Sequence, residues 1–423
     1  MDFRRIALLF ITTLLVSCQP VSNYVSAVQN LISTPETTPL PSPQQPDEQS
    51  LEGVEIRTMT PTITPALATP VSVSDLTTLD TPQPTQIVYG VGNTPIDVNP
   101  LTGLSVPNPE ILNRRPVFVK VSNFPARGSR PQAGLSYADI VFEYYIGEGM
   151  NRFLAVYYGQ DTEKAWPLRS GRLVDAQLVN MYQGVLVYGN ADPDKVDNVL
   201  LEELGERAVS FDDASCPAIC GIATHSETGV YVNTAEITAF TSRIGVKNAR
   251  FPLEGMIFKE DVPESSGRAD QIDINFTTWN RSEWHFDPVS GKYLRWTELW
   301  DNQKDDAWDE HPMTPHIESI TGEQLAFSNI VILFAYYDEY APTLHNIEIW
   351  DNPEKHKAYY FRDGIMVEGS WRAPKHDQPF QFINQNGVPM ALKPGNSWLM
   401  IADYSSPFSE VEEGHWFVQF EIP

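Results

Sequence analysis

"ADIVFEYYIGEGMNRFLAVYYGQ", residues 138–160, consists of two runs of β-branched and aromatic residues on either side of a glycine turn. Runs of this composition are typical of β-strands. Because successive side chains of a strand point to opposite faces, Glu143 shares a face with Val141 and Tyr145. Glu148 falls in the glycine turn. The stretch therefore predicts two strands, with one carboxyl group inside an apolar strand and a second in the turn.

Strands and helices alternate on both sides of this stretch. The runs at 115–124 and 183–190 predict two further strands. Helical patterns occur at the three segments 170–182, 192–206 and 233–245. Asp192, followed by Pro193, is the expected N-cap of the second segment, and a capping box beginning at Asn233 opens the third. This alternation predicts a layered α/β domain, to which we assign residues 93–255.

The pattern changes in residues 256–423. "QIDINF" (271–276) and "EWHFD" (283–287) alternate apolar and polar residues with a period of two. Asp287–Gly291, Asp363-Gly364 and Asn386-Gly387 are hairpin signals between such runs. We therefore expect a mostly antiparallel β domain here, which makes the fold class α+β with two domains.

The first 92 residues predict a targeting signal and a stalk. Two arginines precede the apolar run Ile6–Val16, which is shorter than the ~20 residues of a spanning helix. Leu15-Val16-Ser17-Cys18 resembles the lipobox of bacterial lipoproteins. Residues 1–17 are thus expected to be a signal peptide and Cys18 the lipidated residue. Residues 18–92, which are crowded with Thr-Pro steps, are expected to form a disordered stalk. The predicted location is extracytoplasmic, anchored by lipid to the bacterial cell membrane.

Charge and cysteine content narrow the function classes. The chain has 29 basic and 55 acidic residues and a formal net charge of −26, which argues against binding to nucleic acid. Outside the cytoplasm Cys216 and Cys220 are expected to form a small disulfide loop. A metal site would need further ligands, and only His225 is near in sequence. Because Walker, His-Glu-x-x-His and zinc-ligand patterns are also missing, we expect neither a metal nor a cofactor.

Five arginines nevertheless gather within about fifty residues, at positions 127, 130, 152, 169 and 172. Guanidinium groups match carboxylates and phosphates in a two-pronged geometry. We expect a helix to begin near Ser170, where free backbone N–H groups would favour an anion, and Arg169 and Arg172, one turn apart, could flank that anion. The alternative is internal ion pairing with the many neighbouring carboxylates. The Pro/Gly-rich loop around Arg127 and Arg130 favours a binding cleft over packing.

The two carboxyl groups of the opening stretch allow a different interpretation. A buried carboxyl beside apolar walls has a raised pKa and can act as a general acid. Glu143 and Glu148 could in this way cut a glycosidic bond. A strand glutamate paired with Arg152 is the simpler explanation of Glu143.

Several strings of the sequence resemble the YerB-like family of bacterial lipoproteins. In the first half the shared features are "PLTGL" (100–104), Arg115-Pro116, Asn123, Arg130-Pro131-Gln132, Ala138-Asp139-Ile140-Val141, Glu143, Glu148-Gly149, Arg152-Phe153 and Arg169-Ser170-x-Arg172. In the second half they are "DGIMVEGSW" (363–371) and "GVPMALKPGNSWLMI" (387–401). The resemblance covers about 98–420 and implies two domains of unknown function. Where the family usually has Ala-Pro-His-Asn, this chain has Ala223-Thr224-His225-Ser226, so any role of that histidine would pass to His225.

Three functional hypotheses follow. The first is a lipid-anchored protein that binds an anionic envelope or cell-wall ligand in an arginine-lined cleft of the first domain. Arg130, Arg152, Arg169 and Arg172 would hold the anion, with Asn123 and His225 as polar contacts. The second is an envelope glycan hydrolase or transferase in which Glu143 and Glu148 act as acid and base and His225 assists. The third is a scaffold that docks other envelope proteins through residues 270–423.

Overall fold

The computed structural model describes residues 94–222, 229–299 and 310–421. The predicted signal peptide, Cys18, the stalk and His225 lie outside these described residues. Within them, the strands predicted from the opening stretch are confirmed as β2 (Ile140–Gly147) and β3 (Met150–Tyr157). The neighbouring predictions are confirmed as β1 (Val117–Ser122) and β4 (Val185–Tyr188).

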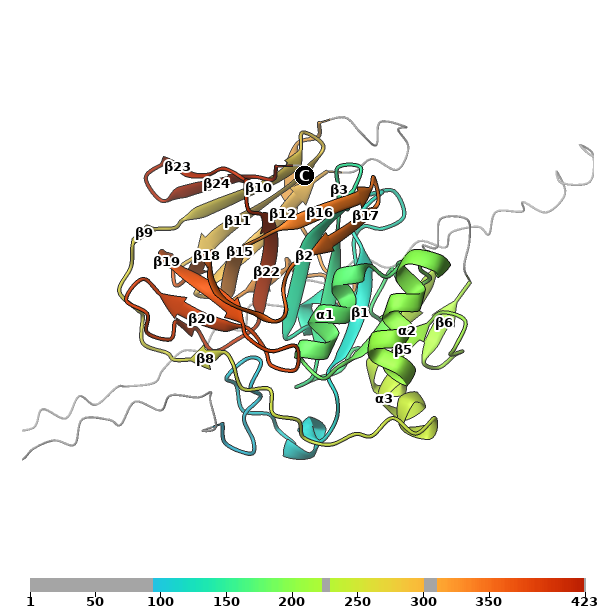
Figure 1. Ribbon diagram of the computed structural model, residues 1–423. Helices are drawn as coiled ribbons and strands as arrows, with labels where there is room; N and C mark the ends of the chain where they lie inside the picture. The colour runs from blue at the N-terminus through green and yellow to red at the C-terminus, as the bar shows by residue number, and fades with distance from the viewer. Residues whose placement is uncertain (1–93, 223–228, 300–309, 422–423) are drawn as a thin grey trace, which may run out of the picture. The chain divides into compact units, whose positions relative to one another are not determined.

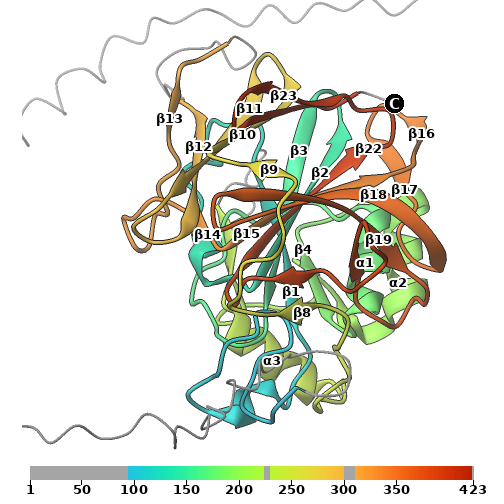
Figure 2. The same cartoon turned by 90° about the vertical axis from the view of Figure 1, so that its left-hand side faces the viewer.

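One large mixed sheet runs through both halves of the sequence (Figures 1 and 2). Its further strands are β5 (Ala208–Ser210), β9 (Gly267–Arg268), β15 (Asn329–Ala335), β18 (Asn352–Arg362), β19 (Ile365–Ala373), β20 (Gln381–Asn384) and β22 (Ser397–Asp403). The order is β20-β19-β18-β15-β22-β2-β3-β1-β4-β5, with β9 beside β19. Strands from the first half thus lie directly beside strands from the second.

The parallel strands of this sheet all point the same way. β1 is parallel to β4, β4 to β5, β2 to β22, and β22 to β15. β3 lies antiparallel between β1 and β2. The carboxyl ends of the parallel strands therefore meet at one edge of the sheet, here called the carboxyl edge, and their amino ends meet at the opposite one, the amino edge.

A second sheet is built from the second half alone. Its strands are β10 (Gln271–Thr277), β11 (Asn280–Asp287), β12 (Lys292–Glu298), β13 (Met313–Pro315), β14 (Ala326–Phe327), β23 (Phe408–Glu412) and β24 (His415–Gln419). Three further strand pairs are β6 (Ile219–Gly221) with β7 (Val230–Val232), β8 (Ile257–Phe258) with β21 (Ala391–Leu392), and β16 (Tyr337–Ala341) with β17 (Leu344–Ile347). The period-two alternation of β10 in the sequence appears here as alternate burial.

The α-helices of the described residues all come from the first half: α1 (Leu173–Met181), α2 (Asn198–Leu204) and α3 (Thr234–Arg243). Short turns are η1 (Pro109–Leu112), η2 (Leu135–Tyr137), η3 (Pro193–Asp197) and η4 (Gly205–Arg207). Asp192 and Asn233 cap η3 and α3 as predicted, each accepting a backbone N–H with its side chain. The start of α1 differs from the prediction, because the helix begins at Leu173 and its N-cap is Arg172 rather than Ser170.

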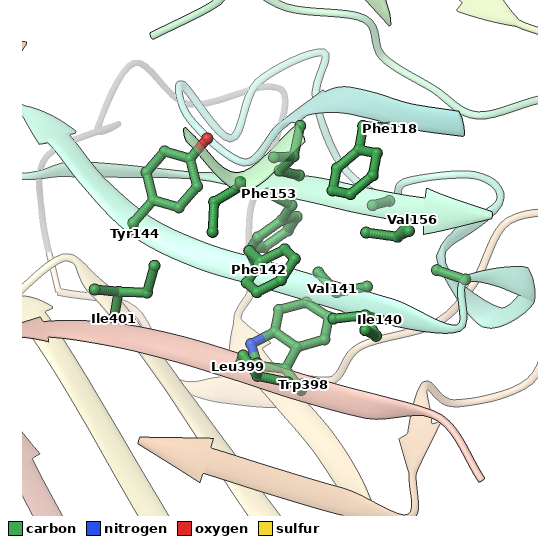
Figure 3. Packing of buried hydrophobic residues seen from close by; sticks show 14 of the residues in the cluster. Phe118, Ile140, Val141, Phe142, Tyr144, Phe153, Val156, Trp398, Leu399 and Ile401 are labelled. Carbon is green, nitrogen blue, oxygen red and sulfur yellow. The ribbon is translucent and has the colours of Figure 1, made fainter. Parts of the chain in front are cut away.

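The core lies where β2 contacts β22. Val141 is opposite Trp398 and Phe142 is opposite Leu399 in the register of these parallel strands. Figure 3 shows the side chains of Ile140, Val141 and Phe142 next to Trp398 and Leu399. All of them are buried, so the two halves share one hydrophobic core.

The fold class is thus a strand-rich protein with few helices. The layered α/β arrangement of the first half stays a prediction. The predicted boundary between residues 255 and 256 separates a half with helices from a half without them in the described chain, but the hydrogen bonds between β2 and β22 cross it.

Candidate functional site

The predicted arginine cluster comes together at the carboxyl edge. Arg152 lies at the start of the antiparallel β3, opposite Ser122 at the end of β1. Arg169 follows Leu168, which pairs with Val121 of β1, and its Nε donates to the Ser122 hydroxyl at 3.2 Å. Arg172 stands at the N-cap of α1. In open sheets with helical connections, ligands bind outside the carboxyl ends of parallel strands.

A small cleft opens at this edge between α1 and η3. Its volume is about 300 Å³, and its polar lining includes Ser170, Arg172, Asn190 and Lys195. Ser170 donates to Asn190 at 2.6 Å, and the backbone of Gly171 is bonded to that of Asn190, so the strand β4 and the start of α1 are tied together here. We call this feature the basic cleft, since it places a guanidinium and an ammonium group in one recess.

The second half supplies the opposite wall of the basic cleft. Ala341, Thr343 and Leu344, around the tip of the β16–β17 hairpin, line it. The hairpin is fixed to α1 by Gln177, whose amide donates to the Ile347 carbonyl at 2.8 Å and accepts from the Ile349 N–H at 3.1 Å. The hairpin tip also touches the β2–β3 turn, where a Cβ on Gly147 would lie 1.8 Å from the Pro342 carbonyl oxygen. Only glycine fits at that position.

A buried ionic cluster lies among these same elements. The Lys120 ammonium contacts the Asp175 carboxylate at 2.9 Å, and the Tyr144 hydroxyl bonds to both groups. Asp175 also accepts the backbone N–H of Arg172 at 2.7 Å, which fixes the start of α1. Burial lowers the pKa of Lys120 to about 7, with Asp175 opposing the shift and Arg172 adding to it. The cluster is fully enclosed, so we assign it to holding the N-cap of α1 rather than to contact with a ligand.

Arg130 is used differently from the other arginines. Its Nη1 forms an ion pair with Glu298 of β12 at 3.2 Å, and its Nε donates to the side-chain Oδ1 of Asn123 at 3.0 Å. The guanidinium also lies 4.5 Å from the Phe124 ring centre. Both charged side chains are nearly inaccessible. Arg130 therefore joins the two halves of the chain, while Arg127 of the same loop is exposed.

Asn123 and Glu143 belong to a closed ring of buried polar side chains, here called the buried polar ring. Its members are Asn123, Gln132, Glu143, Asn151, Arg295 and His316. Asn123 donates to Asn151 at 2.7 Å, and Asn151 donates to Glu143. Glu143 faces Arg295 at 3.5 Å. Arg295 donates to His316 Nδ1 at 2.6 Å, His316 Nε2 donates to Gln132 at 2.7 Å, and Gln132 closes the ring on Asn123 at 3.2 Å.

The charge states within the ring follow from burial. Burial raises the pKa of Glu143, while Arg295 and a 2.7 Å hydrogen bond from the Trp398 indole act in the opposite direction. Burial lowers the pKa of Arg295 to about 10. Burial, aided by Arg295 and Arg130, holds the pKa of His316 well below its usual range, so the imidazole is neutral and its two nitrogens have the roles given above. The ring connects β2 and β3 of the first half with β12 of the second.

The two carboxyl groups of the hydrolase hypothesis are not brought together. Glu143 is enclosed in the middle of β2, whereas Glu148 is exposed in the turn after that strand. The four residues from Glu143 to the end of the strand span about 13 Å at ~3.3 Å per residue. Glycosidases hold their two carboxyl groups roughly 5–9.5 Å apart on either side of a bound sugar. This arrangement offers no shared site for Glu143 and Glu148.

A cavity larger than the basic cleft lies at the amino edge. It measures about 940 Å³ and is lined by the segment after Asn99, by η1 and by residues 394–396 before β22. Asp139, just before β2, is buried in its wall and accepts N–H groups of Tyr158 at 2.7 Å and Gly159 at 2.9 Å. Burial raises the pKa of Asp139 to about 6 against these hydrogen bonds. We call this feature the large cavity.

The remaining predictions concern cysteines, metals and membrane spans. Cys216 and Cys220 form a disulfide with a Cα–Cα distance of 4.5 Å. Among the described residues, no three His, Cys, Asp or Glu side chains are grouped so as to hold a metal ion. No helix in the described ranges is long and apolar enough to span a membrane.

Sequence reasoning missed Lys195, Arg295 and the hairpin that lines the basic cleft. Lys195 had a usable signal, because a cap at Asp192 places it in the first turn, near the end of β4. Arg295 had none, since its partners Glu143 and His316 are distant in the sequence.

The fold and the site define a class of strand-rich, two-part protein, in which a shared sheet and a buried polar ring join the halves. The chain belongs to the family described as "Protein of unknown function (DUF3048)": the model of its N-terminal domain matches residues 101–242, and that of its C-terminal domain matches residues 272–399. The resemblance to the YerB-like family that the sequence motifs indicated is confirmed by the similarity of this chain to YerB itself.

Two relatives from Bacillus subtilis support this membership. The curated YerB protein of strain 168, whose name describes it provisionally as a lipoprotein, is 40% identical over 84 residues. That match spans 20% of this chain and only 25% of the relative. The crystal structure of Bacillus subtilis YerB has the same fold, with a TM-score of 0.58 and 24% identity, over 72% of this chain and 96% of that structure.

Proposed function

We propose that this protein is a lipid-anchored extracytoplasmic binding protein that holds an anionic envelope or cell-wall ligand in the basic cleft. The observation that carries the proposal is the presence of Arg172 and Lys195 in one recess of ligand size. The name of the Bacillus subtilis relative supports the lipid anchor, together with the lipobox-like sequence at Cys18.

The surroundings of the basic cleft favour an anion as the occupant. Arg152 donates to the Ser170 carbonyl at 3.0 Å, and Arg169 precedes Ser170, so two further cations stand beside the cleft. The one carboxylate in the lining, Asp192, accepts backbone N–H groups of Asp194 at 3.1 Å and Lys195 at 3.0 Å. Hydrogen bonding to a charged group is worth about 1.5–3 kcal/mol, which is more than a neutral contact provides.

The contributions of the predicted residues can now be divided. Arg172 would contact the ligand, and Arg152 and Arg169 would raise the local positive potential. Arg130 and Asn123 would act only through the join between the halves. A polyanion would also meet Lys195 and Ser170 in this recess, which makes phosphate-bearing or carboxylate-bearing wall polymers the favoured class.

Native mass spectrometry of the full-length chain with a digest of its host's cell wall tests the proposal. Wild type should carry an added mass, and the Arg172→Ala/Lys195→Ala variant should lose it. Arg127→Ala is the matched control, since it removes an exposed arginine of the same cluster and should retain the adduct. An adduct that survives in the double variant, or is lost in the control, would contradict the assignment to the basic cleft.

The hypothesis of a scaffold that docks envelope proteins has to be tested with the intact chain, not with residues 270–423 alone. Residues 270–423 alone would leave β22 without its neighbour β2, so that fragment exposes the core of the shared sheet. Its capture of other proteins would therefore report exposed apolar surface rather than docking.

A further inference from the structure

The large cavity at the amino edge takes no part in the proposed anion binding. At about 940 Å³ it lies in the range of ligand sites, and both halves of the chain line it. Among the described residues, its lining contains no aromatic ring, and Lys292 is its one cation beside the carboxyl groups of Glu110, Asp139 and Asp161. Sugar sites commonly use aromatic rings and polyanion sites use clustered cations, so neither class of ligand fits this lining.

Several polar groups in the lining are already used to hold the walls. Asp139 accepts three hydrogen bonds, the third from Asn99 at 3.0 Å. Asp161 is paired with Arg114 at 2.7 Å and also accepts the hydroxyl of Thr234 at 2.7 Å. These carboxylates stabilise the turns around the cavity, which gives the recess a preformed shape.

Other polar groups in the lining remain available. Across the described part of the chain, the side chains of Ser105, Ser136 and Gln160 form no hydrogen bond, and no carboxylate lies within ion-pair distance of Lys292. The three uncharged side chains match an occupant with amide groups, and the lysine matches an occupant with one carboxylate. A backbone amide offers both a donor and an acceptor, as the hydroxyl and amide side chains require.

The cavity also has an apolar wall. Leu104, Val106, Pro107 and Ile111 lie within two short segments, and Leu104 is 48% exposed. An exposed leucine by itself is ordinary, but here it stands beside other apolar side chains inside a recess. Covering it with an aliphatic group would remove apolar surface of both partners from water.

We propose that the large cavity binds a short apolar peptide by its free carboxyl end. Lys292 receives the carboxylate, Ser105, Ser136 and Gln160 bond to the peptide amides, and Leu104 and Ile111 contact its aliphatic side chains. Because Lys292 and residues 394–396 come from the second half and η1 from the first, the site is complete only when the halves are joined.

Calorimetric titration of the full-length chain with the tetrapeptide Leu-Ala-Leu-Ala, and with the same peptide as its C-terminal amide, tests the proposal. Wild type should bind the acid about tenfold more tightly than the amide, since the amide lacks the charge that Lys292 recognises. Lys292→Met should abolish this preference by weakening only the acid. Leu104→Asn should weaken both peptides about fivefold, in keeping with the loss of one aliphatic contact.

Lys195→Met is the matched control, because it removes a lysine from the basic cleft and should leave both peptides unaffected. Equal binding of acid and amide, an unchanged acid affinity in Lys292→Met, or absence of heat at millimolar peptide would each overturn the proposal. If decanoate bound as tightly as the acid peptide with the same dependence on Lys292, the occupant would be a fatty carboxylate and the assignment of the amide contacts would be wrong. The proposal is independent of the basic cleft, since variants of Arg172 and Lys195 test that cleft separately.

Discussion

The carboxyl edge and the amino edge of the shared sheet each carry a recess, but they differ in how their charges are used. The carboxyl edge has the predicted arginine cluster, and one member, Arg130, is committed to Glu298 in the join between the halves. The amino edge has the larger recess, and its lining contains three carboxylates and one lysine. A cluster of charged residues in the sequence therefore indicates where ion pairs form. Whether a given charged group can bind a ligand depends on the partners that folding brings to it.

The largest effect is expected where the charges of the carboxyl edge join the halves. Arg295→Met would leave the Glu143 carboxylate buried without its ion-pair partner, because within the described residues its other polar contacts are the neutral groups of Asn151 and Trp398. The free energy of unfolding should fall by about 3–5 kcal/mol in urea titrations. Adding Glu143→Gln to Arg295→Met should recover part of the loss. A single-variant loss below about 1 kcal/mol would mean that the ring does not hold the halves together.

Lys120, at the carboxyl edge, should make the stability of the folded protein depend on pH in the alkaline range. The pKa of Lys120 is lowered in the folded chain to about 7, so the unfolded chain binds its proton more tightly. Stability should therefore increase as the pH rises above about 7, at roughly 1.4 kcal/mol per pH unit up to about pH 9. Lys120→Met should be less stable but should lack this increase, as measured by urea unfolding at each pH. Parallel pH profiles of the two proteins would contradict this role.

Asp139, at the amino edge, should make the stability of the folded protein fall as the pH rises in the acidic range, the opposite of the effect of Lys120. Because the pKa of this carboxyl group is raised to about 6 in the folded chain, its contribution to stability is present below about pH 4 and is lost as the pH rises through 6. Relative to wild type, Asp139→Asn should gain roughly 2–3 kcal/mol between pH 4 and pH 6, because the amide cannot ionise. Unfolding of both proteins across this range measures the difference. A constant difference would show that Asp139 keeps an ordinary pKa.

A smaller effect is expected at the contact that positions the hairpin wall of the basic cleft. Gly147 and Gly245 both have positive φ, at 110° and 102°, but a Cβ on Gly147 would collide with the Pro342 carbonyl, whereas one on Gly245 meets nothing within 4 Å. Gly147→Ala should cost about 1–3 kcal/mol of stability and should weaken the wall-digest adduct. Gly245→Ala should be destabilised only by the backbone strain of its positive φ and should retain the adduct. Equal effects of the two variants on the adduct would show that the hairpin contact at Gly147 does not influence ligand binding in the basic cleft.

Much of the local structure could be predicted from the sequence. The four strands β1 to β4 and the caps at Asp192 and Asn233 were found because alternation and capping act over a few residues. The helix start near Ser170 was misplaced by a short distance, because Asp175 accepts the N–H of Arg172 and so begins the helix at Leu173. The candidate site was predicted in composition only: the arginines do gather at one edge, yet their division into ligand groups and ion pairs was left open.

By itself the sequence determined the elements, the family and the region where the arginines gather, because each of these depends on residues that are neighbours along the chain. Only the tertiary structure decided that β2 pairs with β22, that Arg130 meets Glu298, and that the large cavity lies at the amino edge. The physical reason is distance along the chain. Arg130 and Glu298 are 168 residues apart, and any of the acidic residues nearer in sequence would satisfy a guanidinium equally well until folding brings one of them into contact.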